Sequence, residues 1–168
     1  MIFIFFPYPD GLAIQKGVQM LKIVLSIFMV FITLSPIEAS EDQLLHATIK
    51  VDTAMLKQLL KAGANPNAHD ADGFTALHYA AINNDSTSIR LLLNAGAMKN
   101  ARTQLGVTPL HVTAVKGHHK AMAQLLDAGA DAKAKDASGK TPLDWIKPNS
   151  PAYQSTVYWR LSDAEFRQ

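Results

Sequence analysis

Apolar and polar positions along this chain repeat with a period of 33 residues. Gly73, Gly106 and Gly139 mark the period, and a threonine stands two residues after each of them. Further positions share the register: Leu44, Leu77, Leu110 and Leu143; Ala47, Ala80 and Thr113; the leucine pairs at 59–60, 92–93 and 125–126; and the Gly-Ala pairs at 63–64, 96–97 and 129–130. Self-similarity at so many positions predicts that one structural unit recurs along the chain.

Within one period the pattern predicts two short helices followed by a loop. Thr108 can cap a helix start, and Pro109 suits the first helical position because the amide that it lacks would have no partner there. The inward-facing positions are Leu110, Thr113 and Ala114 in the first helix and Met122, Leu125 and Leu126 in the second. Gly129 ends the second helix, and the polar residues 130–140 form a loop. Neighbouring units must supply the core, because no unit can bury its apolar face alone.

With this period, the sequence resembles the ankyrin-repeat family. The family's Thr-Pro-Leu-His motif stands intact at Thr108–His111, appears as Thr75-Ala-Leu-His78 one unit earlier, and as Thr141-Pro-Leu-Asp144 one unit later. The resemblance covers roughly residues 41–147, and it implies an all-α fold, an α-solenoid of stacked helix-turn-helix units with protruding loops. We expect units at about 40–70, 71–103, 104–136 and 137–168, of which the first departs from the pattern and the last is a degenerate cap.

The last segment of the chain departs from the repeat. Pro148 shortens the first helix of the final unit, and the aromatic-rich residues 152–166 can form a helix whose inward face is Val157, Tyr158 and Leu161. We interpret residues 148–168 as a C-terminal cap, with a partner-binding tail as the alternative.

The first 39 residues have the character of a secretory signal. Lys22 precedes an apolar run from Ile23 to Leu34, which is shorter than the ~20 residues that span a membrane. Small residues follow, so we expect cleavage after Ala39 and a natural start at Met20. The mature protein, residues 40–168, is then exported to the periplasm or secreted; the alternative is an inner-membrane anchor left by an uncleaved signal. Beyond this segment no membrane association is expected.

Composition narrows the function classes. The 168 residues include sixteen Lys and Arg against fourteen Asp and Glu, a net charge of +2, without any basic run interleaved with aromatics. Nucleic acid is therefore not expected as a partner. The chain has no cysteine, which removes disulfides, thiolate nucleophiles and cysteine zinc sites. We expect a monomer without a cofactor.

Three histidines between residues 106 and 119 raise the question of a metal or catalytic site. His111 recurs as His78 one period earlier, and the resemblance implies that this imidazole binds loop backbone between units. Gly117 and His118 match a turn that is common in the family, which leaves only His119 without a structural reason. No Asp, Glu or Cys lies within a helical turn of these histidines to complete a zinc site.

Other kinds of chemistry find no better support. The oxygen-rich stretch 65–73 lacks the ligands that a calcium loop needs, and Asn67, Asp70 and Asp72 are interpreted as turn residues, with Asn67 repeated as Asn100. The sequence has no nucleophile elbow or phosphate loop. A metal-binding protein or an enzyme is therefore the weakest of the functional hypotheses.

The resemblance implies that loop tips and the exposed side of the first helices bind a protein partner. Carried over by position, the expected partner-binding residues are Ile49, Lys50, Ala71, Asp72, Phe74, Ile82, Asn83, Gln104, Leu105, Val107, Val115, Lys116, Ser138 and Lys140. Their apolar members predict a contiguous apolar stripe rimmed by lysines. The alternative is that these aliphatic side chains only pack between units. We expect a module that regulates or stabilises a periplasmic partner, or a secreted factor that binds a host protein.

Overall fold

The computed structural model describes residues 41–153 and 155–166, and it gives burial for side chains up to residue 164. The predictions for the signal region, including the start at Met20 and cleavage after Ala39, lie outside these residues. The helices are α2 (Glu41–Ile49), α3 (Thr53–Lys61), α4 (Ala76–Ile82), α5 (Ser86–Asn94), α6 (Pro109–Lys116), α7 (His119–Asp127), the 3-10 helix η1 (Leu143–Trp145) and α8 (Thr156–Phe166).

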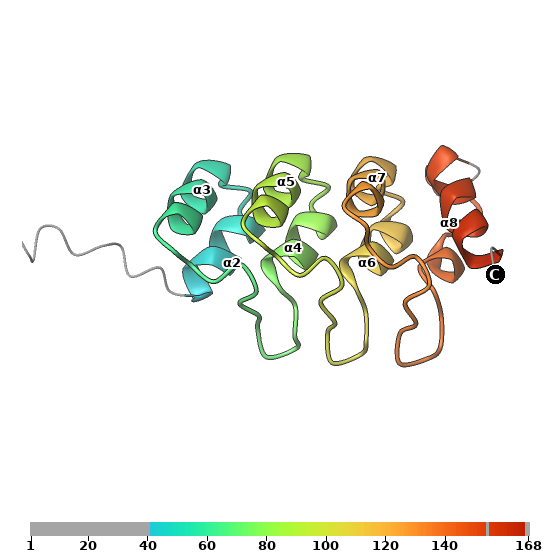
Figure 1. Ribbon diagram of the computed structural model, residues 1–168, viewed down its shortest axis with the longest axis horizontal. Helices are drawn as coiled ribbons and strands as arrows, with labels where there is room; N and C mark the ends of the chain where they lie inside the picture. The colour runs from blue at the N-terminus through green and yellow to red at the C-terminus, as the bar shows by residue number, and fades with distance from the viewer. Residues whose placement is uncertain (1–40, 154, 167–168) are drawn as a thin grey trace, which may run out of the picture. The chain divides into compact units, whose positions relative to one another are not determined.

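The helices form antiparallel pairs that stack side by side (Figure 1). The first helices α2, α4 and α6 make one row and the second helices α3, α5 and α7 make the other, with each helix contacting its neighbour in the row. A long loop leaves each second helix and projects to one side before the next unit begins (Figure 1). The prediction of an all-α solenoid of stacked helix pairs is confirmed.

The core lies between the two rows of helices and between successive units. Its fully buried large side chains come from both rows and from α8: Leu44, Leu56, Leu59, Leu77, Ile89, Leu92, Leu110, Met122, Leu125 and, in α8, Leu161. Each such side chain contributes about 1.5–3 kcal/mol relative to an exposed position. The first helices also bury Ala76, Ala80 and Ala114, which allow adjacent units to approach closely. Burial therefore follows the repeated leucine and alanine positions.

Local capping fixes where the helices begin. Asp52 and Asp85 accept hydrogen bonds from backbone amides in the first turns of α3 and α5. Thr108 and His111 form a capping box at the start of α6, as Thr75 and His78 do for α4. The prediction that Thr108 caps its helix is confirmed.

The turn between the two helices of each unit requires one residue with a positive φ. The three equivalent residues are Val51 (φ 59°), Asn84 (φ 53°) and Gly117 (φ 70°). Glycine adopts this conformation freely and asparagine tolerates it, whereas a β-branched side chain is strained there. The first unit therefore carries local strain at an exposed position that the third unit avoids.

The last unit has a short first helix, and a helix outside the repeat follows it. η1 is a single turn, after which α8 packs against α7 and η1 with Val157 and Leu161 buried and Tyr158 half-buried. Arg160 of α8 forms an ion pair of 2.9 Å with Asp127 of α7. α8 thus occupies the end of the helix rows, where a cap is expected. No helix in the described part of the chain is both long enough and apolar enough to span a membrane.

Candidate partner-binding surface

The buried histidines of the repeated motif connect each unit to the next. Nδ1 of His111 accepts a hydrogen bond from the backbone N–H of Thr108 (3.2 Å), while Nε2 lies 3.0 Å from the carbonyl oxygen of Lys140 in the following unit. His78 repeats this geometry with Thr75 (3.1 Å) and the carbonyl oxygen of Val107 (3.1 Å). Since a carbonyl only accepts, Nε2 must carry the proton and donate it. The expectation that this imidazole binds loop backbone between units is confirmed.

Burial keeps both imidazoles neutral. Burial lowers the pKa of His78 from 6.5 to about 4, although hydrogen bonding to the Val107 carbonyl opposes the shift. Burial likewise lowers the pKa of His111, against the opposing effect of the Lys140 carbonyl. With both ring nitrogens occupied by backbone partners, neither imidazole is available as a metal ligand or a general base.

The two remaining histidines of this stretch lie at the start of α7. Nε2 of His118 is 3.1 Å from the carbonyl oxygen of Ile82, so this side chain connects the third unit to the second, a role that the sequence did not indicate. His119 is exposed. Among the residues that the structure describes, no three His, Asp or Glu side chains come together in an arrangement that could hold a metal ion.

The carboxylate of Asp70 accepts hydrogen bonds both from the backbone of its own loop and from an aromatic side chain. Oδ1 of Asp70 accepts from the amides of Asp72 (3.0 Å) and Phe74 (2.8 Å), and Oδ2 accepts from the Tyr79 hydroxyl (2.5 Å). Burial alone would raise the pKa of Asp70, but these hydrogen bonds outweigh it and lower the pKa. The Asp70 hydrogen bond raises the pKa of Tyr79 to about 12. The interpretation of Asp70 as a turn residue is confirmed.

Two periods later, Asp136 holds the third loop in the same way. Its Oδ1 accepts from the Ser138 hydroxyl (2.7 Å) and the Lys140 amide (2.9 Å), and its Oδ2 accepts from the Trp145 indole N–H (2.9 Å). The Ser138 hydrogen bond contributes most to lowering the pKa of Asp136 to about 2. The middle unit has Thr103 and Val112 at these positions, and there the Thr103 hydroxyl accepts from the amide of Val107.

Side-chain amides also join neighbouring units. Oδ1 of Asn67 accepts from the Met98 amide (2.7 Å), and Oδ1 of Asn100 accepts from the Asp131 amide (2.8 Å). Asn67 and Asn100 thus do more than shape a turn, because each crosses to the following unit. Each of these asparagines therefore ties the loop that follows its helix pair to the next unit.

The residues expected to bind a partner fall into two groups. Ile49, Lys50, Ala71, Asp72, Asn83, Gln104, Leu105, Lys116, Ser138 and Lys140 are exposed, while Phe74, Ile82 and Val115 are half-buried. Leu105, at 70% exposure, and Ile49, at 43%, are the exposed large apolar members of the set.

The prediction of Val107 as an exposed apolar tip is wrong. Val107 is only 7% exposed and joins Ala81 and Val112 in a small buried cluster, against which Ile82 and Trp145 pack. Phe74 lies edge-on to His78 with ring centres 5.5 Å apart. The burial of Val107 therefore interrupts the predicted apolar stripe, while Ile49 and Leu105 remain exposed.

Asn83 is exposed, but its side chain already forms hydrogen bonds to the preceding unit. Its amide nitrogen donates to the carbonyl oxygens of Thr48 (3.1 Å) and Ile49 (3.3 Å) at the end of α2. The equivalent positions in the neighbouring units, Lys50 and Lys116, are exposed lysines at the ends of α2 and α6. Asn83 therefore joins the first two units, whatever else it contacts.

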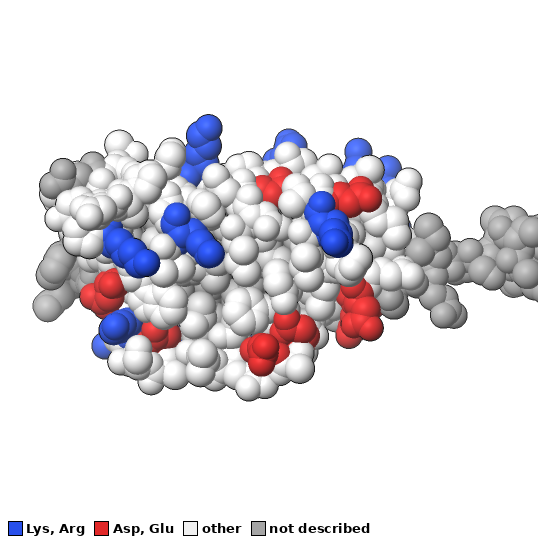
Figure 2. Space-filling view, turned by 180° about the vertical axis from the view of Figure 1, so that it is seen from behind, with Lys and Arg blue, Asp and Glu red and all other residues white. Residues whose placement is uncertain are grey.

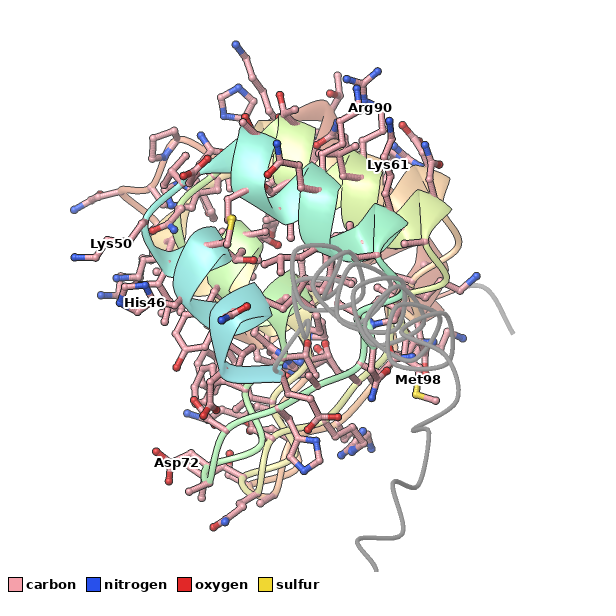
Figure 3. The ribbon with its side chains drawn as sticks, turned by 90° about the vertical axis from the view of Figure 1, so that its left-hand side faces the viewer. His46, Lys50, Lys61, Asp72, Arg90 and Met98 are labelled. Carbon is pink, nitrogen blue, oxygen red and sulfur yellow. The ribbon has the colours of Figure 1, made fainter. Side chains whose placement is uncertain are left out.

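The labelled residues distinguish two sides of the array. Figure 3 shows His46, Lys50 and the loop residue Asp72 on one side and Met98 on the other. Leu105 and Ser138 are the repeat equivalents of Asp72, and Lys116 is the equivalent of Lys50. We define the loop-tip face as these residues together with the exposed Ile49 and Lys140: Ile49, Lys50, Asp72, Leu105, Lys116, Ser138 and Lys140. Figure 2 views the molecule from this side, with Lys and Arg side chains spaced along its middle and Asp and Glu in small groups below them. The face carries both charges rather than a field of one sign.

A hollow of about 510 Å³ lies between the first two loops, and its lining includes Asn67, His69, Met98 and Arg102. Met98 is 63% exposed at this hollow. Exposed apolar surface thus exists both near the loop tips, at Leu105, and on the Met98 side.

Comparison with known families agrees with the geometry. The family model for ankyrin repeats (three copies) matches residues 12–103 and 85–146, and the first match begins within the segment expected to be a signal. No curated protein matches the chain. The two family matches together cover well over half of the 168 residues. The stacked helix pairs, the paired threonine and histidine at the helix starts and this match lead to one conclusion: the chain belongs to the ankyrin-repeat family.

Proposed function

We propose that this protein binds a protein partner through the loop-tip face, with Leu105 as the main apolar contact, and so regulates or stabilises that partner. Ankyrin repeats are generic protein–protein interaction modules, and their fold is a typical non-enzymatic scaffold. The proposal that this chain acts by binding, without catalysis of its own, rests on that property and on the occupied ring nitrogens of His78 and His111.

One observation carries the choice of surface. Leu105 is 70% exposed, although the equivalent residues of the first and third loops, Asp72 and Ser138, are polar. Its backbone is held in place, because its carbonyl oxygen accepts from the Ala137 amide (2.9 Å) and the preceding Gln104 amide donates to Asp72 (2.9 Å). A large apolar side chain on a rigid backbone loses little conformational entropy on binding and is typical of an interface contact.

The binding proposal is tested by cross-linking in cells, followed by recovery of the complex from the exported fraction. Leu105→Ala should reduce recovery of the cross-linked partner by about ten-fold, since burying a leucine is worth about 1.5–3 kcal/mol. Met98→Ala is the matched control, because Met98 is similarly exposed but lies on the other side of the array (Figure 3). Undiminished recovery with Leu105→Ala would refute the proposal, and loss with Met98→Ala instead would assign binding to the opposite side.

We further propose that the protein works in the periplasm after cleavage of its signal. Support comes from the order of Lys22, the apolar run 23–34 and the small residues ending at Ala39. Fractionation of cells that express the full chain tests this proposal, together with sequencing of the mature N-terminus, which is expected at Ser40. Recovery from the medium would favour a secreted factor that binds a host protein, and a full-length chain in the membrane fraction would favour an uncleaved anchor.

A further inference from the structure

The three loops form a stack in which each loop covers the preceding one. The amide of Gln104 donates to the carbonyl oxygen of Asp72, and the amide of Ala137 donates to that of Leu105, both at 2.9 Å. These two hydrogen bonds are equivalent in the repeat, since both donors and acceptors are 33 residues apart. Figure 1 shows the loops side by side below the helices. Each interior loop thus presents one backbone acceptor to the loop that follows.

Side chains reinforce the same contacts in both directions. The Gln104 side-chain amide donates back to the carbonyl oxygen of Ala71 (2.5 Å), so two successive carbonyls of the first loop face the second. The Arg102 guanidinium donates forward to the carbonyl oxygen of Lys135 in the third loop. The first loop thus offers two carbonyl acceptors to its neighbour, and the second offers one carbonyl acceptor and the long basic side chain of Arg102.

The third loop has the same edge without a covering loop. The equivalents of the two carbonyls belong to Ala137 and Ser138, and neither accepts a hydrogen bond from any residue in the described part of the chain. A Cβ placed on Gly73 would lie 3.0 Å from Thr103 of the next loop, and one on Gly106 would lie 3.0 Å from Ala137. A Cβ on Gly139 would have nothing within 4 Å. Position 139 therefore faces free space, whereas positions 73 and 106 face backbone atoms of the next loop.

The helix layer at this end is already filled. α8 packs against α7 and η1, the place that the helices of a further repeat would take. In Figure 1 α8 stands at the end of the helix rows, and no described segment lies beyond the last loop. Another helix pair cannot be added in register without displacing α8, but the loop edge has room for a single extended strand.

The basic residues at this edge indicate the charge of that strand. Lys135 occupies the position from which Arg102 reaches the next loop, and both Lys135 and Lys140 are exposed. Of the loop's two carboxylates, Asp136 is buried and accepts from Ser138, Lys140 and Trp145. The other, Asp131, is exposed at the start of the loop and accepts from the Lys133 amide (2.9 Å). Asp144 of η1 is exposed, and its carboxylate accepts from Thr141 (2.8 Å). An incoming carboxylate is thus favoured near Lys135 and Lys140.

We infer that the open edge of the third loop, formed by Lys135, Ala137, Ser138, Gly139 and Lys140, binds an extended acidic segment of a partner protein as a fourth layer of the loop stack. The strand donates a backbone N–H to the carbonyl of Ser138 and places a carboxylate beside Lys135. Backbone pairing supplies the docking geometry and the lysines select for acidic side chains. The site shares Ser138 and Lys140 with the loop-tip face and adjoins Leu105 through the Ala137 amide, so it extends the proposed binding surface past the last loop.

The probe is a short synthetic peptide of alternating threonine and glutamate, with a second peptide in which glutamine replaces glutamate. Titration into the isotope-labelled protein should move the ¹⁵N resonance of Gly139, because its amide nitrogen is bonded to the carbonyl carbon of Ser138. The glutamine peptide should bind about three-fold more weakly or worse, as expected for the loss of exposed ion pairs. No shift at Gly139, or equal binding of the two peptides, would overturn the inference.

Variants test whether the acidic peptide binds at this edge or to exposed basic residues in general. Lys135→Gln should weaken binding of the glutamate peptide, whereas Lys61→Gln, at the end of α3 in the first unit, should not. Gly139→Asn tolerates the positive φ and places a side chain in the open space, so it should block the strand while the protein stays folded. Equal effects of the two lysine variants would overturn the assignment of the site.

Discussion

Acid should loosen the contacts between units by protonating the buried histidines. Nδ1 of His78 faces the backbone N–H of Thr75 at 3.1 Å, and this geometry requires an unprotonated nitrogen. Adding a proton would place two donors against each other in a buried site. His111 has the same arrangement with Thr108, so two successive interfaces respond to the same change in pH.

The size of the effect follows from the shift in pKa. Burial lowers the pKa of His78 from 6.5 to about 4, which corresponds to about 3 kcal/mol of stability at neutral pH. The unfolded chain takes up the proton below 6.5, but the folded protein does so only near 4. Stability is therefore complete above 6.5 and is lost as the pH falls from 6.5 to about 4. His111 acts in the same direction, because burial also lowers its pKa.

Carboxylates affect a different pH range. The pKa values of Asp70 and Asp136 are lowered from 3.8, so their contribution is lost at more acidic pH. The range between 6.5 and 4 consequently reports on the two buried histidines.

Urea unfolding followed by circular dichroism, repeated from neutral pH down to about 4, measures this loss directly. His78→Gln should be less stable than the wild type at neutral pH, and its stability should fall by about 3 kcal/mol less over this range. His119→Gln is the matched control, since His119 is exposed and should leave the wild-type pH dependence in place. If wild type and His78→Gln lost the same stability between neutral pH and about 4, the assignment of a neutral, hydrogen-bonded His78 would be refuted.

Three further predictions concern backbone strain, loop contact and the aromatic pair. Val51→Gly should raise stability in urea by about 1 kcal/mol, because glycine adopts φ 59° without the strain of a β-branched residue; an unchanged midpoint would argue against that strain. Gly73→Ala should destabilise the protein by about 1–3 kcal/mol more than Gly139→Ala in thermal unfolding, since only at Gly73 does the new methyl meet neighbouring backbone; equal losses would contradict the close approach of the loops. Tyr79→Phe should raise the pKa of Asp70 in an NMR titration and cost about 1 kcal/mol, and an unaltered pKa would show that their hydrogen bond is absent in solution.

The fold follows from the sequence because the repeat combines several local signals that agree. Thr108 and Pro109 define a helix start, Gly129 a helix end, and the leucines a buried face, and the structure contains each of them where the period places it. The inter-unit role of His111 followed only from the family resemblance, since nothing in its own local sequence reveals a partner 29 residues away.

The surface could be predicted only in part, because exposure depends on side chains from the next unit. Val107 resembles an exposed tip residue by position, but Trp145 packs on the cluster that contains it. A signal for this part of the array was present in the sequence: aspartate stands at 70 and 136 where aromatics stand at 79 and 145, and threonine at 103 where valine stands at 112. A position-by-position comparison of the units is enough to pair these carboxylates with the aromatic donors.

Residues that depart from the repeat have different explanations at the end of the array and in its interior. At the C-terminal end of the array, the uncovered Gly139 stands where α8 takes the place of a further unit's helices, so the fold itself accounts for its environment. Leu105 lies in an interior loop, with its backbone hydrogen-bonded to the loop on either side, yet it exposes an apolar side chain where the equivalent positions are polar. Packing gives no reason for a leucine there, and a polar residue would fit the same backbone. The exposed Leu105 side chain does not stabilise the fold, and contact with a binding partner would explain its presence.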